Sequence, residues 1–404
     1  MVNLVQKNYL MQRYDVIIAG GGPAGSTAAT LLSQYGYKVL ILEKDQHPKF
    51  HIGESMMPLI EPVMNRLGLD WGKGNLKKMG ADFIHEPSGR TLFLPLMGKY
   101  QTYQIERSSF DQKMFNNAIA HGAEAYQNTK VADVVINENA VRVSTSEGDF
   151  EGRYFIDATG RSALMGRKFR KVKRLENFGR YALFQHYQLT DNSAVEAVFS
   201  TGNVKILLVD VGWLWIIPLI DKRLSVGLVV QKQSKLNVAK EQLFKQYIEA
   251  SPLLTSLLDN SEVILPIQAE ADFSYINQRR YGARYACCGD AAGFLDPVFS
   301  SGFFFAVKTA ELIADRLHQG LLTGQESDPQ LHAKDDSLYK TGFNTMWLLI
   351  DRFYRSSLVE NLIFEFDRHE RIKDEITALL AGDLWSEDNL FQQGLLKGRR
   401  AAIL

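Results

Sequence analysis

The sequence predicts an α/β protein with α+β insertions, organised around a Rossmann-like nucleotide-binding domain. The first observation is a short apolar run over 14–19 that leads into the glycine loop Gly20-Gly21-Gly22-Pro23-Ala24-Gly25 and then a helical stretch. The second is a further apolar run over 38–42 that ends at Glu43. The third is a later stretch of strand-like alternation, which predicts a mainly antiparallel sheet beside this domain.

The glycine loop predicts a dinucleotide site because it lies between a strand and a helix within one βαβ unit. Its glycines allow the backbone to approach a pyrophosphate, and the N-terminus of the following helix, over 26–35, faces the negative charge. Glu43 follows the second strand, where a carboxylate accepts hydrogen bonds from a ribose. We therefore expect the chain to hold a dinucleotide at this loop.

Two later strand ends extend this domain: the segment Phe155–Arg161 and the segment Tyr285–Gly293, followed by a helix over about 303–318. Their distance from the first unit predicts a discontinuous domain interrupted by insertions. Alternation over 183–230, with turn signals at Asp191-Asn192 and Thr201-Gly202-Asn203, predicts the antiparallel sheet. The expected division is a nucleotide-binding domain over 14–83, 107–165 and 281–320, a substrate-domain sheet over 84–106 and 170–275, and a C-terminal helical region over 331–404.

Composition restricts the function classes. Among the 404 residues, 46 Lys and Arg balance 46 Asp and Glu, which argues against nucleic acid as the main ligand. No apolar run reaches the length of a membrane span, and residues 1–13 lack a signal core. The adjacent Cys287 and Cys288 predict core residues without a disulfide framework, in a reducing, cytoplasmic setting. His85, His121 and His186 show no metal-ligand spacing, so no metal site is expected.

The string Gly212-Trp213-Leu214-Trp215-Ile216-Ile217-Pro218 carries the most specific signal. One interpretation is that Trp213, Trp215 and Ile217 are alternate residues on one face of a buried strand. The other follows from a resemblance, because this WxWxIP string is similar to the signature of flavin-dependent halogenases. In those enzymes the paired indoles separate the flavin from the organic substrate.

The combined motifs resemble the para-hydroxybenzoate-hydroxylase-like flavoproteins and, within them, the phenol- and pyrrole-type flavin-dependent halogenases. The motifs are the glycine loop, Glu43, Gly53-Glu54-Ser55, Asp157-Ala158-Thr159-Gly160, Gly289-Asp290 and Phe294–Gly302. The resemblance implies FAD, used as FADH2, with chloride or bromide as the second reactant. The cofactor contacts that it implies are Gly20, Gly22, Ala24, Gly25, Glu43, Lys44, Gly53, Glu54, Ser55, Arg107, Asp290, Pro297 and Gly302.

The resemblance also implies the catalytic groups. Backbone N–H groups of Ser301 and Gly302 would bind the halide near the flavin, and Lys78 matches the family's lysine, with Lys77 as the alternative by a one-residue shift. This lysine would hold hypohalous acid as an ammonium or form a haloamine as a free amine, and burial suits both by lowering its pKa. Trp213 and Trp215 would seal the flavin compartment.

The tryptophan-halogenase subgroup has a glutamate where this chain has Phe299. The resemblance therefore implies an aromatic substrate that activates itself, a pyrrole or phenol rather than free tryptophan. The basic run Arg167, Lys168, Arg170, Lys171, Lys173 and Arg174 indicates either a solvated surface or a docking face for an acidic acyl or peptidyl carrier protein. Since the chain has no second glycine loop for a nicotinamide, a separate flavin reductase is expected as a partner.

Three other functions stay open at this point. An aromatic hydroxylase of the same fold would use the tryptophan pair as core and would not need Lys78. A flavin reductase resembling the geranylgeranyl reductases would act on an unsaturated lipid. A catalytically idle flavoprotein would serve as an assembly partner.

Overall fold

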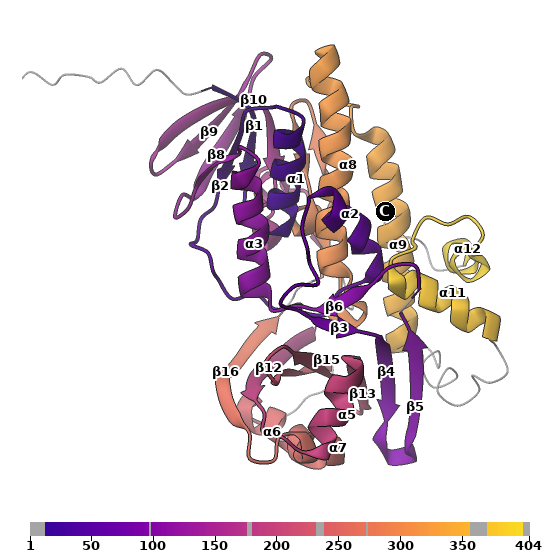
Figure 1. Cartoon of the computed structure of the whole chain (residues 1–404). Helices are drawn as coiled ribbons and strands as arrows, with labels where there is room; N and C mark the ends of the chain where they lie inside the picture. Colours follow the sequence, from indigo (N-terminus) through magenta and orange to yellow (C-terminus); the bar gives the residue numbers. More distant parts are fainter. Residues whose placement is uncertain are drawn as a thin grey trace, which may run out of the picture.

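The computed structural model describes residues 13–96, 98–175, 180–231, 238–271, 274–355 and 370–398. Two sheets dominate the molecule, one above the other in Figure 1, and a group of C-terminal helices lies along their side. Within the described residues, no helix combines the length and the apolar character that crossing a bilayer requires.

The first sheet contains the predicted βαβ unit. Strand β1 (Arg13–Ala19) pairs in parallel with β2 (Val39–Leu42) and with β10 (Gly148–Asp157), and helix α1 (Pro23–Gln34) connects β1 to β2. This confirms the predicted strand–loop–helix–strand order. Strands β7 (Glu124–Tyr126), β18 (Tyr281–Gly282) and β19 (Tyr285–Cys287) continue the sheet, and β8 (Val131–Ile136) and β9 (Val141–Thr145) form a hairpin beside β10.

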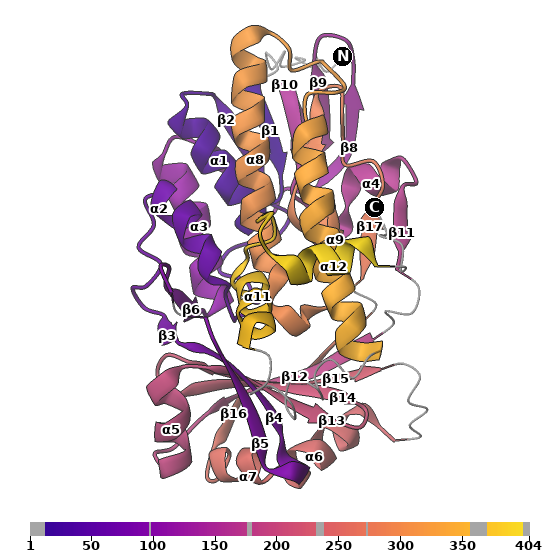
Figure 2. The same cartoon turned by 90° about the vertical axis from the view of Figure 1, so that its right-hand side faces the viewer.

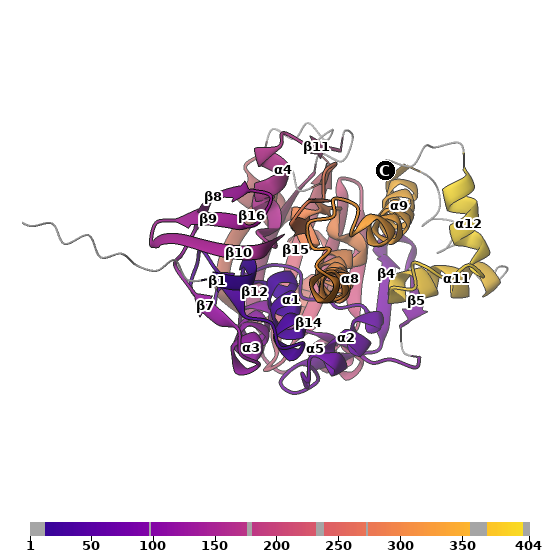
Figure 3. The ribbon, with the colours of Figure 1, turned by 90° about the horizontal axis from the view of Figure 1, so that it is seen from above.

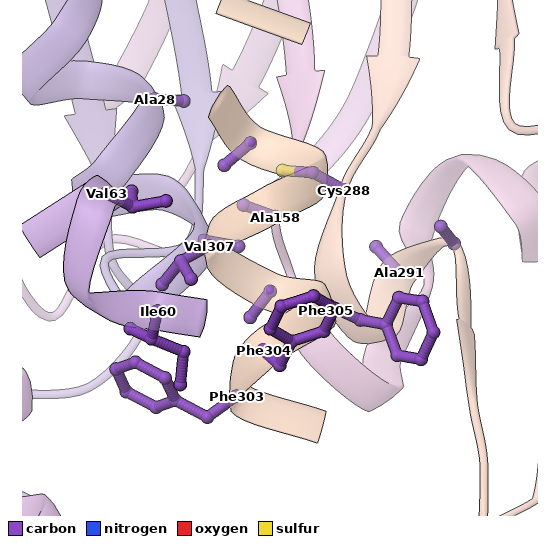
Figure 4. Packing of buried hydrophobic residues seen from close by; sticks show 14 of the residues in the cluster. Ala28, Ile60, Val63, Ala158, Cys288, Ala291, Phe303, Phe304, Phe305 and Val307 are labelled. Atoms are coloured by element: carbon purple, nitrogen blue, oxygen red, sulfur yellow. The ribbon is translucent and has the colours of Figure 1, made fainter. Parts of the chain in front are cut away.

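The core beside this sheet forms where helix α8 (Ser301–Thr323) packs against α1, with α3 (Arg107–Ala120) on the other side of α1. Figure 4 shows Phe303 of α8 beside Ile60 within this core. Cys287 and Cys288 are both buried and form no disulfide, so their interpretation as core residues is confirmed. The apolar contact fixes the N-terminus of α8 next to the end of the first sheet.

The second sheet has seven strands, and the prediction of a mainly antiparallel sheet is confirmed. Its order is β16 (Glu262–Ala271), β12 (Arg180–Gln188), β15 (Arg223–Gln231), β14 (Gly212–Leu219), β13 (Val204–Val209), β4 (Gly80–His85) and β5 (Arg90–Pro95). Every pair is antiparallel except β13 with β4. One face of the sheet shares an apolar core with α6 (Lys240–Ala250) and α7 (Pro252–Leu257), and the other faces the first sheet.

Three details of the predicted organisation need correction. The turn signals at Asn192 and Gly202 flank a helix, α5 (Ser193–Thr201), because Asn192 accepts from the backbone N–H of Val195 at 2.9 Å and Gly202 ends the helix at φ +60°. The expected boundary between residues 83 and 84 falls inside β4. Strand β4 follows strand β3 (Leu76–Lys78) after a single residue, and β3 pairs with β6 (Thr102–Gln104) in a separate two-stranded sheet.

Some of the segment 170–275 also lies outside the second sheet. Strands β11 (Val172–Arg174), β17 (Tyr275–Asn277) and β20 (Gly293–Phe294) form a separate three-stranded sheet. From residue 331 onward the described chain is mostly helical, as its pattern predicts, with α9 (Ala333–Arg355), α11 (Glu370–Ala381) and α12 (Leu390–Lys397). Figure 3 shows these helices on the side of the molecule away from β8 and β9.

Candidate active site

A cavity of about 520 Å³ lies between the two sheets. Its size is that of a small-molecule or cofactor site. Residues from both sheets, from the loop over 49–57 and from the start of α8 form its wall. Almost all of the residues expected to bind the cofactor line it: Gly20, Gly22, Ala24, Glu43, Lys44, Gly53, Glu54, Ser55, Arg107, Asp290, Pro297 and Gly302. Gly25 is the exception.

The glycine loop leaves space for a ligand at Gly22 and is closely packed against backbone at Gly25. A Cβ on Gly22 would meet no atom within 4 Å, whereas a Cβ on Gly25 would lie 1.9 Å from the carbonyl oxygen of Gly20. Helix α1 begins at Pro23, and Gly22 at its N-cap supplies no side-chain acceptor to the first turn. The N–H groups of that turn therefore face the cavity without a side-chain partner, which fits the pyrophosphate of FAD.

Glu43 is held as an acceptor at the end of β2. One carboxylate oxygen accepts from the backbone N–H of Gly21 at 2.6 Å, and the other accepts from Nζ of Lys49 at 2.6 Å. The side chain is only 2% exposed, yet it lines the cavity. This fixed carboxylate beside the glycine loop fits the expected ribose contact.

Arg107 fastens the loop over 52–55 to helix α3. Its Nε and one terminal nitrogen donate to the two carboxylate oxygens of Asp111 at 2.9 and 2.7 Å. The remaining nitrogen donates to the carbonyl oxygens of Ile52 at 3.3 Å and Gly53 at 3.1 Å. The bidentate ion pair holds the guanidinium rigid, so the loop is anchored before any ligand binds.

Two carboxylates, those of Asp290 and Glu54, line the cavity. Burial raises the pKa of Asp290 to about 6, against the charges of Arg107 and Arg161. Glu54 is 1% exposed and lies 3.2 Å from Nε2 of His186, while its Oε2 is buried without a hydrogen-bond partner among the described residues. A buried polar atom of this kind ordinarily has a partner, so it fits a wall that a bound cofactor completes.

Lys78 points inward between the two sheets. Its Nζ donates to Oγ of Ser55 at 2.8 Å and to the carbonyl oxygen of Met56 at 2.9 Å, and the side chain is 2% exposed. Burial lowers the pKa of Lys78 to about 7. The neighbouring Lys77 is exposed, because adjacent residues of strand β3 point to opposite sides. Of the two candidate lysines, the structure therefore brings Lys78 into the cavity.

Trp213 and Trp215 are alternate residues of β14, as the core interpretation expects, and both also line the cavity. Their ring centroids are 6.0 Å apart. Trp215 lies flat over Gly227 of the neighbouring strand, where a Cβ would come within 2.1 Å of the indole. Its Nε1 donates to Oγ of Ser225 at 3.1 Å. The two interpretations of this motif are thus compatible, since the buried face of the strand is a cavity wall.

The segment before α8 forms the remaining wall. The 3-10 turn Pro297–Phe299 leads through Ser300 at φ +56° into α8, whose N-terminus has no side-chain cap. Gly302 lines the cavity, but Ser301 is buried and is not part of the wall. Phe299 lines the cavity and makes an edge-on contact with Phe353 at 5.5 Å. The part of the cavity expected to hold the halide is therefore formed by the N-terminus of α8 and the ring of Phe299.

The basic run is a surface feature. All six of its side chains are exposed, on α4 (Leu164–Lys168), β11 and the turn that joins them. Lys168 forms an ion pair with Asp133. The run starts three residues after Leu164, which lines the cavity together with Arg161 and Ser162. Elsewhere, the described chain contains no group of three or more His, Cys, Asp or Glu side chains arranged to bind a metal ion.

Sequence reasoning missed several residues of the site. Asp111 lies four positions after Arg107 on one helix, a spacing that predicts an ion pair. Asp296 precedes a proline and caps the turn that follows, which is also a readable signal. Tyr354 and Arg180, which contact Asp296, come from distant elements, and no local pattern marks them.

Comparison with known proteins gives consistent results. The model of the tryptophan halogenase family matches residues 15–85 and 90–388. The chain is 30% identical to the 1H-pyrrole-2-carbonyl-[peptidyl-carrier protein] brominase of Pseudoalteromonas luteoviolacea, covering 95% of this chain and 96% of that protein. It is 28% identical to the corresponding chlorinase of Pseudomonas fluorescens, covering 93% and 91%. The solved structure of the flavin-dependent brominase Bmp2 superposes with a TM-score of 0.82 at 28% identity, covering 95% and 98%.

The chain therefore belongs to the tryptophan halogenase family and is a flavin-dependent halogenase, an enzyme that uses reduced FAD, O2 and a halide. This confirms the resemblance drawn from the motifs. It favours halogenation over the hydroxylase, the geranylgeranyl-reductase-like enzyme and the idle flavoprotein.

Proposed function

We propose that this flavin-dependent halogenase acts on a pyrrole or a phenol, with Lys78 as the group that delivers the oxidised halide to the ring. The observation that supports this most is the position of Lys78. Its Nζ is hydrogen bonded to Ser55, on the loop expected beside the flavin, and it shares one cavity with the tryptophan pair.

Reduced FAD, when bound with O2, supplies the two-electron oxidation of halide to hypohalous acid. Gly22 and the first turn of α1 would receive its pyrophosphate, and Glu43 its ribose. Backbone N–H groups at the start of α8, at Ser301 and Gly302, would hold the halide. Trp213 and Trp215 would exclude the ring substrate and bulk water from the flavin side.

Lys78 can act in either of two protonation states because burial brings its pKa to about 7. As an ammonium it donates a hydrogen bond to the oxygen of hypohalous acid. As a free amine it forms a bond to the halogen and releases water. Either role requires a lysine that is buried and that no carboxylate neutralises, and no ion pair involves Lys78 within the described residues.

The aromatic wall at Phe299 supports an electron-rich substrate. Phe299 stands where the tryptophan-halogenase subgroup has a glutamate, and its ring packs on Phe353 rather than offering a carboxylate. A ring that attacks the halogen must then be activated by its own nitrogen or phenol oxygen. The two relatives that act on a pyrrole bound to a peptidyl carrier protein support the same substrate class.

The exposed basic run supports a carrier-bound substrate. Its charges closely follow Arg161 and Leu164 in the sequence, and these two residues line the cavity. An acidic carrier protein would be attracted to the exposed charges. A separate flavin reductase would supply FADH2. The two buried cysteines, which form no disulfide, support a reducing, cytoplasmic setting.

The test compares Lys78→Ala with Lys77→Ala in the FAD-loaded enzyme supplied with a flavin reductase, halide and a carrier-bound pyrrole. We expect Lys78→Ala to oxidise reduced flavin at the normal rate and to form no halogenated ring, and Lys77→Ala to behave as wild type. Halogenation at a near-normal rate by Lys78→Ala would exclude Lys78 as the delivering group.

A further inference from the structure

Trp213 is joined to the C-terminal helix α9 by a hydrogen bond. Its Nε1–H donates to Oη of Tyr354 at 2.7 Å. Tyr354 lies in the last turn of α9, whose lower end reaches the second sheet near β14 and β15 in Figure 2. The orientation of an indole on the cavity wall therefore depends on a residue more than a hundred positions away.

Tyr354 also holds the turn that precedes α8. Its O–H donates to Oδ1 of Asp296 at 3.0 Å, and the same oxygen accepts from the backbone N–H of Val298 at 3.1 Å. Asp296 is fully buried and caps the turn Pro297–Phe299. The carboxylate thus joins Tyr354 to the segment that carries Phe299 and the start of α8.

Arg180 of strand β12 completes the network. A terminal nitrogen of its guanidinium donates to Oδ2 of Asp296 at 3.2 Å, and its central carbon lies 3.4 Å from the centroid of the Tyr354 ring. The cation compensates the buried carboxylate and packs on the phenol ring. Both the ring plane and the hydroxyl direction of Tyr354 are therefore fixed by neighbours other than Trp213.

We propose that Tyr354 is a positioning residue that locks the indole of Trp213 to the turn before α8 and so keeps oxidised halide in the cavity until it meets the ring. Its hydroxyl bonds to both walls, accepting from Trp213 and donating to Asp296. The inference rests on the proposed role of the tryptophan pair as a wall. It adds that this wall is held by helix α9 through Tyr354.

The variant Tyr354→Phe removes the hydroxyl and keeps the ring that Arg180 packs on. Tyr339→Phe is the matched control, because Tyr339 lies on the same helix and its buried hydroxyl has no hydrogen-bond partner among the described residues. We expect Tyr354→Phe to bind FAD normally but to form about two- to tenfold less halogenated ring per flavin oxidised, the loss corresponding to one hydrogen bond. The missing oxidant should appear in a chemical trap for free hypohalous acid.

A second readout uses the FAD-free protein. NMR of ¹⁵N-labelled indoles gives one signal for each of the five tryptophans, and Trp213→Phe identifies the signal of Trp213. In Tyr354→Phe we expect that signal alone to exchange faster with solvent, and in Tyr339→Phe no change. The same two tyrosine variants are then made in the Trp213→Phe background, where the effect of Tyr354→Phe on coupling should largely vanish.

Three results would overturn the inference: unchanged exchange of the Trp213 signal in Tyr354→Phe, an unchanged ratio of product to flavin oxidised, or an equal loss of coupling in the Trp213→Phe background. The exchange measurement needs neither substrate nor halide. Failure of the proposed function therefore leaves that measurement intact, and the two failures can be told apart.

Discussion

The buried lysine has a thermodynamic consequence that can be measured without substrate. Lowering the pKa of Lys78 from 10.5 to about 7 means that the charged lysine costs the folded protein on the order of 5 kcal/mol, at 1.36 kcal/mol per pKa unit. Replacing it by methionine, which has a similar length and no charge, removes that cost. The variant also loses the hydrogen bonds to Ser55 and Met56. Their loss costs roughly 3 kcal/mol of stability and offsets part of that gain. We therefore expect Lys78→Met to be more stable than wild type by about 2 kcal/mol at pH 6.

The difference in stability between wild type and Lys78→Met must change with pH in a defined direction. Between pH 7 and 10.5 the unfolded chain keeps the lysine proton that the folded protein has released, so the stability of wild type rises with pH while that of Lys78→Met does not. Wild type should regain about 2 kcal/mol relative to the variant from pH 7 to pH 9. Urea unfolding of the FAD-free proteins at pH 6, 7, 8 and 9 measures this, with the exposed Lys77→Met as control. A stability difference that stays constant over this range would refute the argument for a perturbed Lys78.

Three further predictions follow from the site. Gly22→Val should fold but lose FAD in a fluorescence titration, because its side chain would point into the open cavity. Gly25→Val should first lower the midpoint of unfolding, because its side chain would collide with the backbone of Gly20. Stoichiometric FAD in Gly22→Val would contradict the assignment of the glycine loop as the FAD site. Trp215→Ala should release more free hypohalous acid and couple less flavin oxidation to ring halogenation, while losing about 3–5 kcal/mol of stability; destabilisation with unchanged coupling would assign it to the core alone. Lys171→Glu combined with Arg174→Glu should weaken turnover of a carrier-bound ring and flatten its salt dependence, leaving a free substrate unaffected; equal effects on both substrates would exclude a docking face there.

The parts of the fold that could be predicted are those in which a local pattern carries the information. The βαβ unit is visible because strand, glycine loop, helix and Glu43 are consecutive. Helix α5 could not be predicted from the sequence, because Asn192 and Gly202 are as typical of turns as of helix caps. The parallel pairing of β4 with β13 joins segments more than a hundred residues apart, and no short-range pattern reports such a pairing.

The residues of the site also divide into those that a local sequence pattern marks and those that only tertiary packing brings together. The cofactor residues belong to motifs of fixed spacing, and nearly all of them line one cavity. The choice between Lys77 and Lys78 could not be made from the sequence, because a shift of one residue in a strand turns every side chain to the other face. The contact of Tyr354 with Trp213 depends on how α9 docks on the second sheet, which is set by tertiary packing.

Halogenation of an electron-rich ring is the central claim, and mass spectrometry tests it most directly. The enzyme with FAD, O2 and a flavin reductase is given a carrier-bound pyrrole or a free phenol, with chloride or bromide, and Lys78→Ala is run in parallel. We expect a halogenated ring that forms only with halide and only with wild type, while both proteins oxidise reduced flavin. A hydroxylated ring, or an unmodified ring with either halide and either substrate, would contradict the account.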